Sequence, residues 1–276
     1  MKIGYTVWTW GSETWKGATK KDFEQAAKEI SELGYDAVED FNRLVATFED
    51  APDEFEEILE KYGLEFVNLY HYLREDFDAD YALAERCCKF LNCHGTRLLN
   101  MQAPPRPGRL DPKAEMRAPT EKELDQFIQN LTKVAKMAAG YDVTTTLHPH
   151  WGTMVERENE LTYVAERLDP ELVKLTLDTA HTILGGMDPV KTFSQYVDRV
   201  AYVHLKDVVV PSPDPKNPMV GFREIGRGVV DFRGVVKVLK DGGYDGVLCV
   251  ELDNPRICNY KSAMISRRYI REELGL

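Results

Sequence analysis

Apolar residues follow two alternating periodicities along this chain. Short apolar runs typical of buried strands begin near residues 2, 35, 64, 96, 143, 173, 200 and 245. Between them, apolar side chains recur every three or four positions, as at Phe23, Ala26, Ala27 and Ile30. That spacing places them on one face of an α-helix. The pattern therefore predicts strands that alternate with helices from one end of the chain to the other.

The amphipathic stretches predict eight helices. We expect them over residues 21–33, 52–61, 80–91, 121–139, 158–168, 189–197, 232–240 and 261–273. Glycines follow four of these stretches, at positions 34, 63, 95 and 243, where a helix end favours a residue with positive φ. Thr120 and Glu123 form a predicted capping box, and Asp188 with Pro189 marks another helix start.

Eight strand–helix units predict the α/β fold class and a (β/α)8 TIM barrel, as a single domain over residues 1–276. A doubly wound open sheet is the alternative, but no glycine-rich dinucleotide fingerprint follows an early strand. Two long breaks in the pattern, residues 103–119 and 208–228, follow the fourth and seventh strands. Loops at that end of a barrel commonly shape the active site.

Charge and composition narrow the class of partner. The 276 residues include 35 Lys and Arg against 46 Asp and Glu, a net charge of −11. Such a surface repels a phosphate backbone, so no nucleic-acid partner is expected. No signal peptide and no apolar run of about 20 residues is evident, so no membrane association is expected. Five cysteines without regular spacing indicate reduced thiols and a cytoplasmic location.

The fifth to eighth predicted strands each end in a side chain that can bind a metal. These side chains are His148, Asp178, His204 and Glu251, and each follows an apolar residue. Parallel barrel strands end around one mouth, so the four are expected to converge there. One such residue alone is usually a core or capping residue, but four together are hard to satisfy without a cation. Two imidazoles and two carboxylates suit Mn, Co, Fe or Zn.

Short motifs surround these four residues. His148, His150, Gly152 and Thr153 form His-x-His-x-Gly-Thr, and residues 203–207 read Val-His-Leu-Lys-Asp. Residues 178–181 read Asp-Thr-Ala-His, and residues 226–232 contain Gly-x-Gly-x-x-Asp-Phe. The chain thereby resembles the xylose-isomerase-like TIM barrels, the superfamily of sugar isomerases, ketose epimerases and endonuclease IV. Its C-terminal half is most similar to the inosose (2-keto-myo-inositol) dehydratases.

The chain departs from that dehydratase pattern in three places. Ala180 replaces a glycine of the strand-six motif, and Leu252 follows Glu251 where those enzymes keep another acid. The loop after Asp207 is shorter than is usual among them. The metal ligands are unaffected by these departures, whereas the identity of the substrate depends on them.

The resemblance implies a divalent-metal-dependent lyase that dehydrates a keto-polyol, such as inosose or a keto-sugar, through a metal-stabilised enediolate. Its cofactor would be one divalent ion, Mn²⁺ or Co²⁺, with Zn²⁺ or Fe²⁺ as alternatives. Lys206, two residues beyond His204, faces the same side of its strand. We expect burial and the metal to lower its pKa, and we assign it as base or proton shuttle with His150 as partner.

Other members of the superfamily fit less well. Ketose epimerases of this fold place a Glu ligand on both strand five and strand eight, whereas strand five here carries His148. A metal-dependent isomerase or epimerase acting on a ketose or keto-sugar is nevertheless the alternative, since His150 or Lys206 could serve as its base. Endonuclease IV needs further ligands where this chain has Val220 and Phe222, which bind no metal. A barrel that only binds a sugar or a partner is the third hypothesis.

Further polar residues fall at predicted strand ends or in the long loops. We expect substrate contacts from four of them, Glu39, His71, Gln102 and His181. The expected partner is a small keto-polyol or sugar, and homo-oligomers are common in the superfamily.

Three charged loop residues have predicted roles outside catalysis. Arg106 and Arg109 are expected to be solvated, although either could meet a carboxylate or a phosphate. Asp207 is expected to form a salt bridge with a loop arginine such as Arg227.

Overall fold

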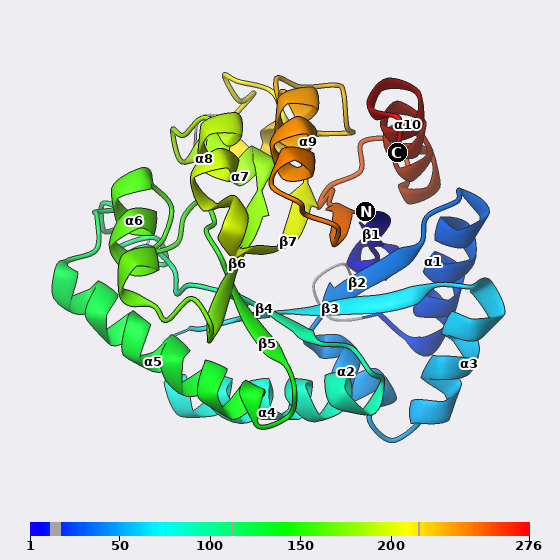
Figure 1. The fold of residues 1–276 in the computed structure, drawn as a ribbon, viewed down its shortest axis with the longest axis horizontal. Helices are drawn as coiled ribbons and strands as arrows, with labels where there is room; N and C mark the ends of the chain where they lie inside the picture. Colours follow the sequence, from blue (N-terminus) through cyan, green and yellow to red (C-terminus); the bar gives the residue numbers. More distant parts are fainter. Residues whose placement is uncertain (12–17, 75, 112, 215) are drawn as a thin grey trace.

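Eight parallel strands close into a barrel surrounded by helices (Figure 1). The computed structural model describes residues 1–11, 18–74, 76–111, 113–214 and 216–276. Neighbouring strands follow the order β1-β10-β7-β6-β5-β4-β3-β2, and the last strand pairs with the first. The predicted (β/α)8 TIM barrel is confirmed. Among the described residues, no helix is both long enough and apolar enough to cross a bilayer.

The regular elements agree closely with the periodicities of the sequence. The barrel strands are β1 (Lys2–Thr6), β2 (Ala37–Phe41), β3 (Glu65–Tyr72), β4 (Leu98–Gln102), β5 (Thr144–His148), β6 (Val173–Asp178), β7 (Val200–Leu205) and β10 (Val247–Val250). The predicted helices are found as α1 (Lys20–Glu32), α3 (Pro52–Tyr62), α4 (Phe77–Cys93), α5 (Glu121–Ala139), α6 (Glu158–Arg167), α8 (Pro189–Tyr196), α9 (Phe232–Asp241) and α10 (Asn259–Leu274).

The structure adds short elements that the periodicity did not predict. They are the helices α2 (Arg43–Phe48) and α7 (Thr179–Leu184), the 3-10 turns η1 (Trp8–Trp10), η2 (Val197–Arg199) and η3 (Pro218–Gly221), and the antiparallel pair β8 (Asp207–Val208) and β9 (Phe222–Arg223). Each has six residues or fewer, which is too short to show a clear hydrophobic period. The β8–β9 pair lies in the long loop after β7.

The helix boundaries follow the predicted signals. The Thr120 hydroxyl accepts the Glu123 N–H while the Glu123 side chain accepts the Thr120 N–H, which completes the predicted capping box. The Asp188 side chain accepts the Lys191 N–H, and Pro189 occupies the first turn of α8. Gly63 ends α3 in the left-handed region at φ 63°, where a residue without a Cβ has no steric penalty.

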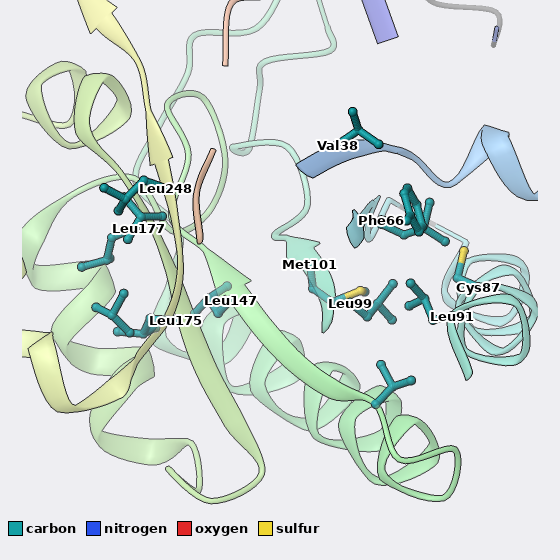
Figure 2. Packing of buried hydrophobic residues seen from close by; sticks show 14 of the residues in the cluster. Val38, Phe66, Cys87, Leu91, Leu99, Met101, Leu147, Leu175, Leu177 and Leu248 are labelled. Carbon is teal, nitrogen blue, oxygen red and sulfur yellow. The ribbon is translucent and has the colours of Figure 1, made fainter. Parts of the chain in front are cut away.

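Alternation along the strands separates an apolar outer layer from a polar barrel interior. Outward-facing residues such as Leu147, Leu175 and Leu248 belong to the core between strands and helices (Figure 2). Cys87 lies in the same core on α4, where Figure 2 shows it close to Leu91. Cys87, Cys88 and Cys249 are buried and free, as expected for structural thiols.

The side chains inside the barrel form a hydrogen-bonded polar layer. The Thr146 and Thr176 hydroxyls lie 2.7 Å apart across β5 and β6, and Thr146 also donates to Asn100 on β4. On the other side, Asn68 of β3 accepts the Asn100 N–H at 3.1 Å. Since side chains alternate with a period of two, the next inward residue of each strand faces the barrel mouth. The candidate metal ligands occupy these positions.

Candidate metal centre and active-site cavity

The four predicted metal ligands meet at the C-terminal ends of their strands. His148 ends β5, Asp178 ends β6, His204 lies in β7 and Glu251 directly follows β10. Each offers one ligand atom, and these atoms all lie within 4.8 Å of one another. The four residues are between 0 and 4 % exposed. The predicted convergence is therefore found, and the group could hold a divalent cation.

Distances within the cluster identify the atoms that face each other. His148 Nε2 lies 3.1 Å from His204 Nδ1, which lies 2.8 Å from Glu251 Oε2. Asp178 Oδ2 lies 4.0 Å from each of these ring nitrogens and has no hydrogen-bond partner although it is buried. A buried carboxylate oxygen without a partner is costly, so this donor set fits a cation.

Asp178 has a second task in addition to facing the cluster. Its Oδ1 accepts the His181 N–H at 2.7 Å, and Asp178 is thus the N-cap of α7. Capping fixes the carboxylate and directs the other oxygen, Oδ2, toward the cluster. Burial raises the pKa of Asp178 to about 7, against the opposing effect of Lys206.

Glu39 holds His204 from behind. His204 Nε2 and Glu39 Oε2 lie 2.8 Å apart, and the Tyr202 hydroxyl donates to the same oxygen at 3.0 Å. Glu39 is 0 % exposed. The carboxylate orients the imidazole, with Nδ1 facing the cluster, as carboxylates commonly do behind a ligating histidine. The expected substrate contact of Glu39 stays a prediction.

His204 and Glu251 shift each other's pKa in opposite directions. Burial alone would lower the pKa of His204, but the Glu39 and Glu251 carboxylates outweigh it and raise the pKa well above its ordinary value. Burial would raise the pKa of Glu251, but Lys206 and His204 outweigh it and lower the pKa. The pKa of His148 is lowered, chiefly by burial and next by His204.

Lys206 projects into the same site, as its position two residues after His204 predicted. Its ammonium lies 2.7 Å from Glu251 Oε1, 3.0 Å from Asp253 Oδ2 and 3.7 Å from Asp178 Oδ2, and it is 0 % exposed. Burial alone would lower its pKa, but these three carboxylates raise the pKa above its ordinary value. These carboxylates oppose the lowering expected from burial and the metal, and they favour a protonated Lys206.

The pKa of His150, unlike that of Lys206, is lowered by its surroundings. Its Nδ1–H donates to the Trp151 carbonyl oxygen at 2.7 Å, which leaves Nε2 as the proton-accepting nitrogen of the ring. Burial, assisted by Lys206, lowers the pKa of His150 to about 3, so the ring is neutral at pH 7. The His150 and His181 rings stack with centroids 3.6 Å apart.

The remaining predicted substrate contacts separate into two groups. Gln102 lines the main cavity. His71 is one residue after the inward-facing Tyr70, so it points outward, where its ring nitrogens meet Asn42 Nδ2 at 2.5 Å and the Asp80 carbonyl at 3.0 Å. His181 is 1 % exposed, and its Nε2 lies 3.2 Å from Lys206 Nζ. His71 thus faces away from the cavity and His181 lies behind Lys206, and the expected substrate contacts of both stay predictions.

A cavity of about 680 Å³ opens above the cluster. Its described lining residues are Phe41, Arg43, Tyr70, Tyr72, Leu73, Arg74, Asp76, Gln102, Pro105, Arg109, Leu110, His150, Met219, Glu251 and Asp253. Sequence reasoning missed Asp253 and Tyr70. Asp253 lies two residues beyond Glu251, and the alternation that located Lys206 would have found it. Tyr70 carries no such signal, because an aromatic residue in a strand usually indicates core packing.

A closed (β/α)8 barrel with a buried His₂-carboxylate₂ group at its C-terminal mouth defines a class of metal-site barrels. Residues 27–274 match the family described as Xylose isomerase-like TIM barrel, and this chain belongs to that family.

Two curated relatives are both inosose dehydratases. The one from Geobacillus thermodenitrificans is 32% identical over 169 residues, which cover 57% of this chain and 57% of that protein. The match thus spans little more than half of that relative's length. The one from Geobacillus kaustophilus is 28% identical over 270 residues, covering 90% of this chain and 86% of that protein.

Solved structures share the fold along the whole chain. The probable 3-DHS dehydratase AsbF from Bacillus anthracis has a TM-score of 0.79 at 16% identity, covering 99% of this chain and 100% of that one. The IOLI protein with a bound zinc atom has a TM-score of 0.78 at 16% identity, covering 99% and 97%. The 3-keto-D-glucoside 4-epimerase YcjR from E. coli has a TM-score of 0.75 at 17% identity, covering 98% and 99%.

Proposed function

We propose that this protein is a divalent-metal-dependent hydro-lyase that dehydrates a keto-polyol, an inosose or a keto-sugar. The observation that carries the proposal is the buried group of His148, Asp178, His204 and Glu251, with Lys206 Nζ 2.7 Å from Glu251 and the His150 ring 5.5 Å from that of His148. Inosose dehydratases among the sequence relatives, and a 3-DHS dehydratase with the same fold, support a dehydration.

The four ligands would hold the cation through the atoms that face one another. His148 Nε2, His204 Nδ1, Asp178 Oδ2 and an oxygen of Glu251 are the donors nearest to the centre of the cluster. A bound divalent ion supplies a Lewis acid that polarises the substrate carbonyl and stabilises the negative charge developing on its oxygen. Mixed imidazole and carboxylate donors suit Mn²⁺ or Co²⁺, with Zn²⁺ or Fe²⁺ as alternatives.

His150 and Lys206 divide the proton transfers between them. His150 Nε2 has a free lone pair and accepts the proton from the carbon next to the carbonyl, while the Trp151 carbonyl holds its Nδ1–H. The electron pair of that C–H bond forms the new C=C bond as the β-carbon–oxygen bond breaks. Lys206 is protonated and donates a proton to the departing hydroxyl, which leaves as water. The structure thereby favours Lys206 as acid rather than base.

An epimerase acting on a keto-sugar is the second candidate, favoured by one specific feature. Asp253 lines the cavity next to Glu251 and supplies a carboxylate that the strand ends alone did not predict. The fold is also that of a 3-keto-D-glucoside 4-epimerase. Strand five, however, carries His148 rather than a second carboxylate ligand, so proton exchange on both faces of the substrate would need His150.

One experiment separates these activities. A panel of keto-polyols is incubated in D₂O with Mn²⁺-loaded protein, and the products are analysed by mass spectrometry beside a His204→Ala control. A metal-dependent product lighter by one water supports the lyase. A product of unchanged formula that has gained one deuterium supports the epimerase. Metal-loaded protein that changes no member of the panel would contradict both and favour a barrel that only binds.

The surroundings of the protein follow from charge and cysteine chemistry. We infer that its partners are small molecules rather than nucleic acid, because the net charge is −11. A cytoplasmic location is part of this proposal and is supported by the free cysteines, which are Cys87, Cys88, Cys93, Cys249 and Cys258. A homo-oligomer stays a prediction from the superfamily.

A further inference from the structure

The cavity is larger than the polyol ring that the proposed reaction requires. A six-carbon ring with six oxygens fills roughly 360 Å³ even when each atom is given the ~30 Å³ of a water molecule in the liquid. The cavity offers about 680 Å³. If the ring lies against Glu251 and His150, much of the cavity extends beyond it, toward the barrel mouth.

That outer part carries three arginines. Glu251, Asp253 and His150 at the inner end are buried, whereas Arg43 and Arg109 are half-buried and Arg74 is exposed. Exposure thus increases from the metal ligands toward the arginines, which places the guanidinium groups nearer to the opening. The chain as a whole has a net charge of −11, so a group of three positively charged side chains around one opening differs from the average of the molecule.

Each guanidinium rests on an aromatic ring. Arg43 lies 5.6 Å from the centroid of Phe41, Arg74 lies 4.4 Å from that of Tyr72, and Arg109 lies 4.7 Å from that of Trp151. Stacking holds a guanidinium plane while its N–H groups stay available at the edges. Arg74 uses one of them on the Tyr72 hydroxyl and Arg109 uses one on the Trp151 carbonyl. Oriented N–H donors remain on all three.

The described carboxylates around this opening lie beyond ion-pair distance of the three arginines. Within the described residues, no ion pair joins a carboxylate to Arg43, Arg74 or Arg109. Asp76 lines the cavity, but its Oδ1 accepts the Ala79 N–H as the N-cap of α4. Asp253 is paired with Lys206 at the inner end. Among the described residues, the three guanidinium groups therefore keep N–H donors for an anionic group of a ligand.

We propose that the substrate carries an oxyanion, a carboxylate or a phosphate, that Arg43, Arg74 and Arg109 bind while the keto-polyol part lies at the metal ligands. This inference rests on the proposed function and narrows its substrate class from neutral cyclitols to anionic ones. Carboxylate and phosphate share the planar, paired acceptors that a guanidinium binds with two N–H groups. Arg43 and Arg74 are the residues to change, because Arg109 also holds the loop backbone through its hydrogen bond to the Trp151 carbonyl oxygen.

Binding of unreactive rings tests the inference apart from catalysis. Calorimetry compares myo-inositol, inositol 1-phosphate and quinate, a cyclohexane polyol carboxylate, on Mn²⁺-loaded protein. None of these has a ketone, so none can undergo the proposed elimination. We expect at least one charged ring to bind about 10-fold or more tightly than myo-inositol, and added salt to weaken that preference. The ring that gains most identifies the anion as phosphate or carboxylate.

Two variants separate the arginines from the metal. In the double variant R43Q/R74Q, the preference for the charged ring should fall about 10-fold, while Mn²⁺ and myo-inositol bind as before. The matched control is R233Q, which removes one exposed arginine paired with Glu273 outside the cavity. An equal affinity for charged and neutral rings would overturn the inference. So would a preference that survives undiminished in R43Q/R74Q, since the anion would then bind away from these arginines.

Turnover distinguishes failure of this inference from failure of the proposed function. Charged rings that bind as expected, with no ketone losing water, would leave the arginine assignment standing and refute the lyase. The opposite result is also possible to recognise. If neutral inosose and its charged counterpart are dehydrated with the same kcat/KM, in both wild type and R43Q/R74Q, the lyase is supported and the arginine assignment is refuted.

Discussion

At the residue scale, His204 shows how a buried side chain is prepared for ligation. Its two ring nitrogens face different carboxylates, Glu39 on one side and Glu251 on the other. Glu39 is in turn held by Tyr202 and Asn68. A carboxylate behind a ligating imidazole fixes both the ring orientation and the nitrogen that is presented. Glu39 is thus a positioning residue.

Glu39→Gln tests that role. The amide keeps the shape but loses the charge that favours a donated proton on His204 Nε2, so Mn²⁺ affinity should fall about 10–100-fold. Calorimetry measures the affinity, and circular dichroism checks that the barrel is intact. An unchanged affinity in a folded variant would show that Glu39 does not orient His204.

Asp40, next to Glu39 but on the outer side of β2, predicts a pH dependence of stability. Burial raises its pKa to about 7, and Oδ2 has no hydrogen-bond partner. The unfolded pKa is about 3.9, so between about pH 4 and 7 the folded chain holds a proton that the unfolded chain has released. Stability attributable to this group is present at low pH and is lost as the pH rises toward 7.

Asp40→Asn should remove that loss. Relative to wild type, the variant should gain roughly 2–3 kcal/mol of unfolding free energy at pH 8 compared with pH 5. Urea denaturation at both pH values measures the difference. A constant difference between the two proteins across this range would mean that Asp40 ionises normally in the folded state.

At the scale of elements, the loop between β7 and α9 is built around one carboxylate. Asp207 accepts the backbone N–H groups of Val208, Gly226, Gly228 and Val230. The expected salt bridge with Arg227 is not among the ion pairs of the described residues, and backbone amides take its place. The close approach explains the Gly-x-Gly motif, since a Cβ on Gly228 would lie 2.2 Å from Asp207 Oδ1.

Gly228→Ala should therefore loosen this loop. The added Cβ would also lie 2.3 Å from the Val208 carbonyl oxygen, so the backbone must shift, at a cost of roughly 1–3 kcal/mol. Gly140→Ala is the control, since its Cβ would come no nearer than 3.2 Å to a neighbour. Thermal unfolding of both variants gives the comparison. Equal melting temperatures would refute the packing argument.

At the scale of the whole molecule, the metal ligands connect separate parts of the barrel. They come from β5, β6, β7 and the end of β10, which are adjacent strands in the closed sheet. Four strand ends whose carboxylates repel one another would be joined by a bound cation. Because the site exists only in the folded chain, metal binding adds to the unfolding free energy.

Mn²⁺ should accordingly stabilise the whole barrel. At about 100 times Kd the gain is about 2.7 kcal/mol, which for a chain of this size raises Tm by about 5–10 °C. Differential scanning calorimetry with and without Mn²⁺ measures the shift, and His204→Ala should abolish it. A similar shift in that variant would place the bound ion elsewhere.

Much of the architecture was readable from the sequence because it depends on local periodicity. The eight strands, the eight long helices, the caps at Thr120 and Asp188 and the convergence of His148, Asp178, His204 and Glu251 follow from spacing, turn chemistry and the parallel barrel. The short helices α2 and α7 were missed, because six residues contain less than two helical turns.

The tertiary structure alone decided what the converging groups do. Glu39 and His71 both lie near strand ends. The Glu39 carboxylate contacts His204 on the side away from the cluster. His71 follows the inward-facing Tyr70 by one residue, so its side chain points out of the barrel toward α4. The charge state of Lys206 depends on Asp253, Glu251 and Asp178, which come from two other strand ends. Sequence determines which side of its own strand a residue faces. Protonation and partners depend on distances between strands, which only the closed barrel sets.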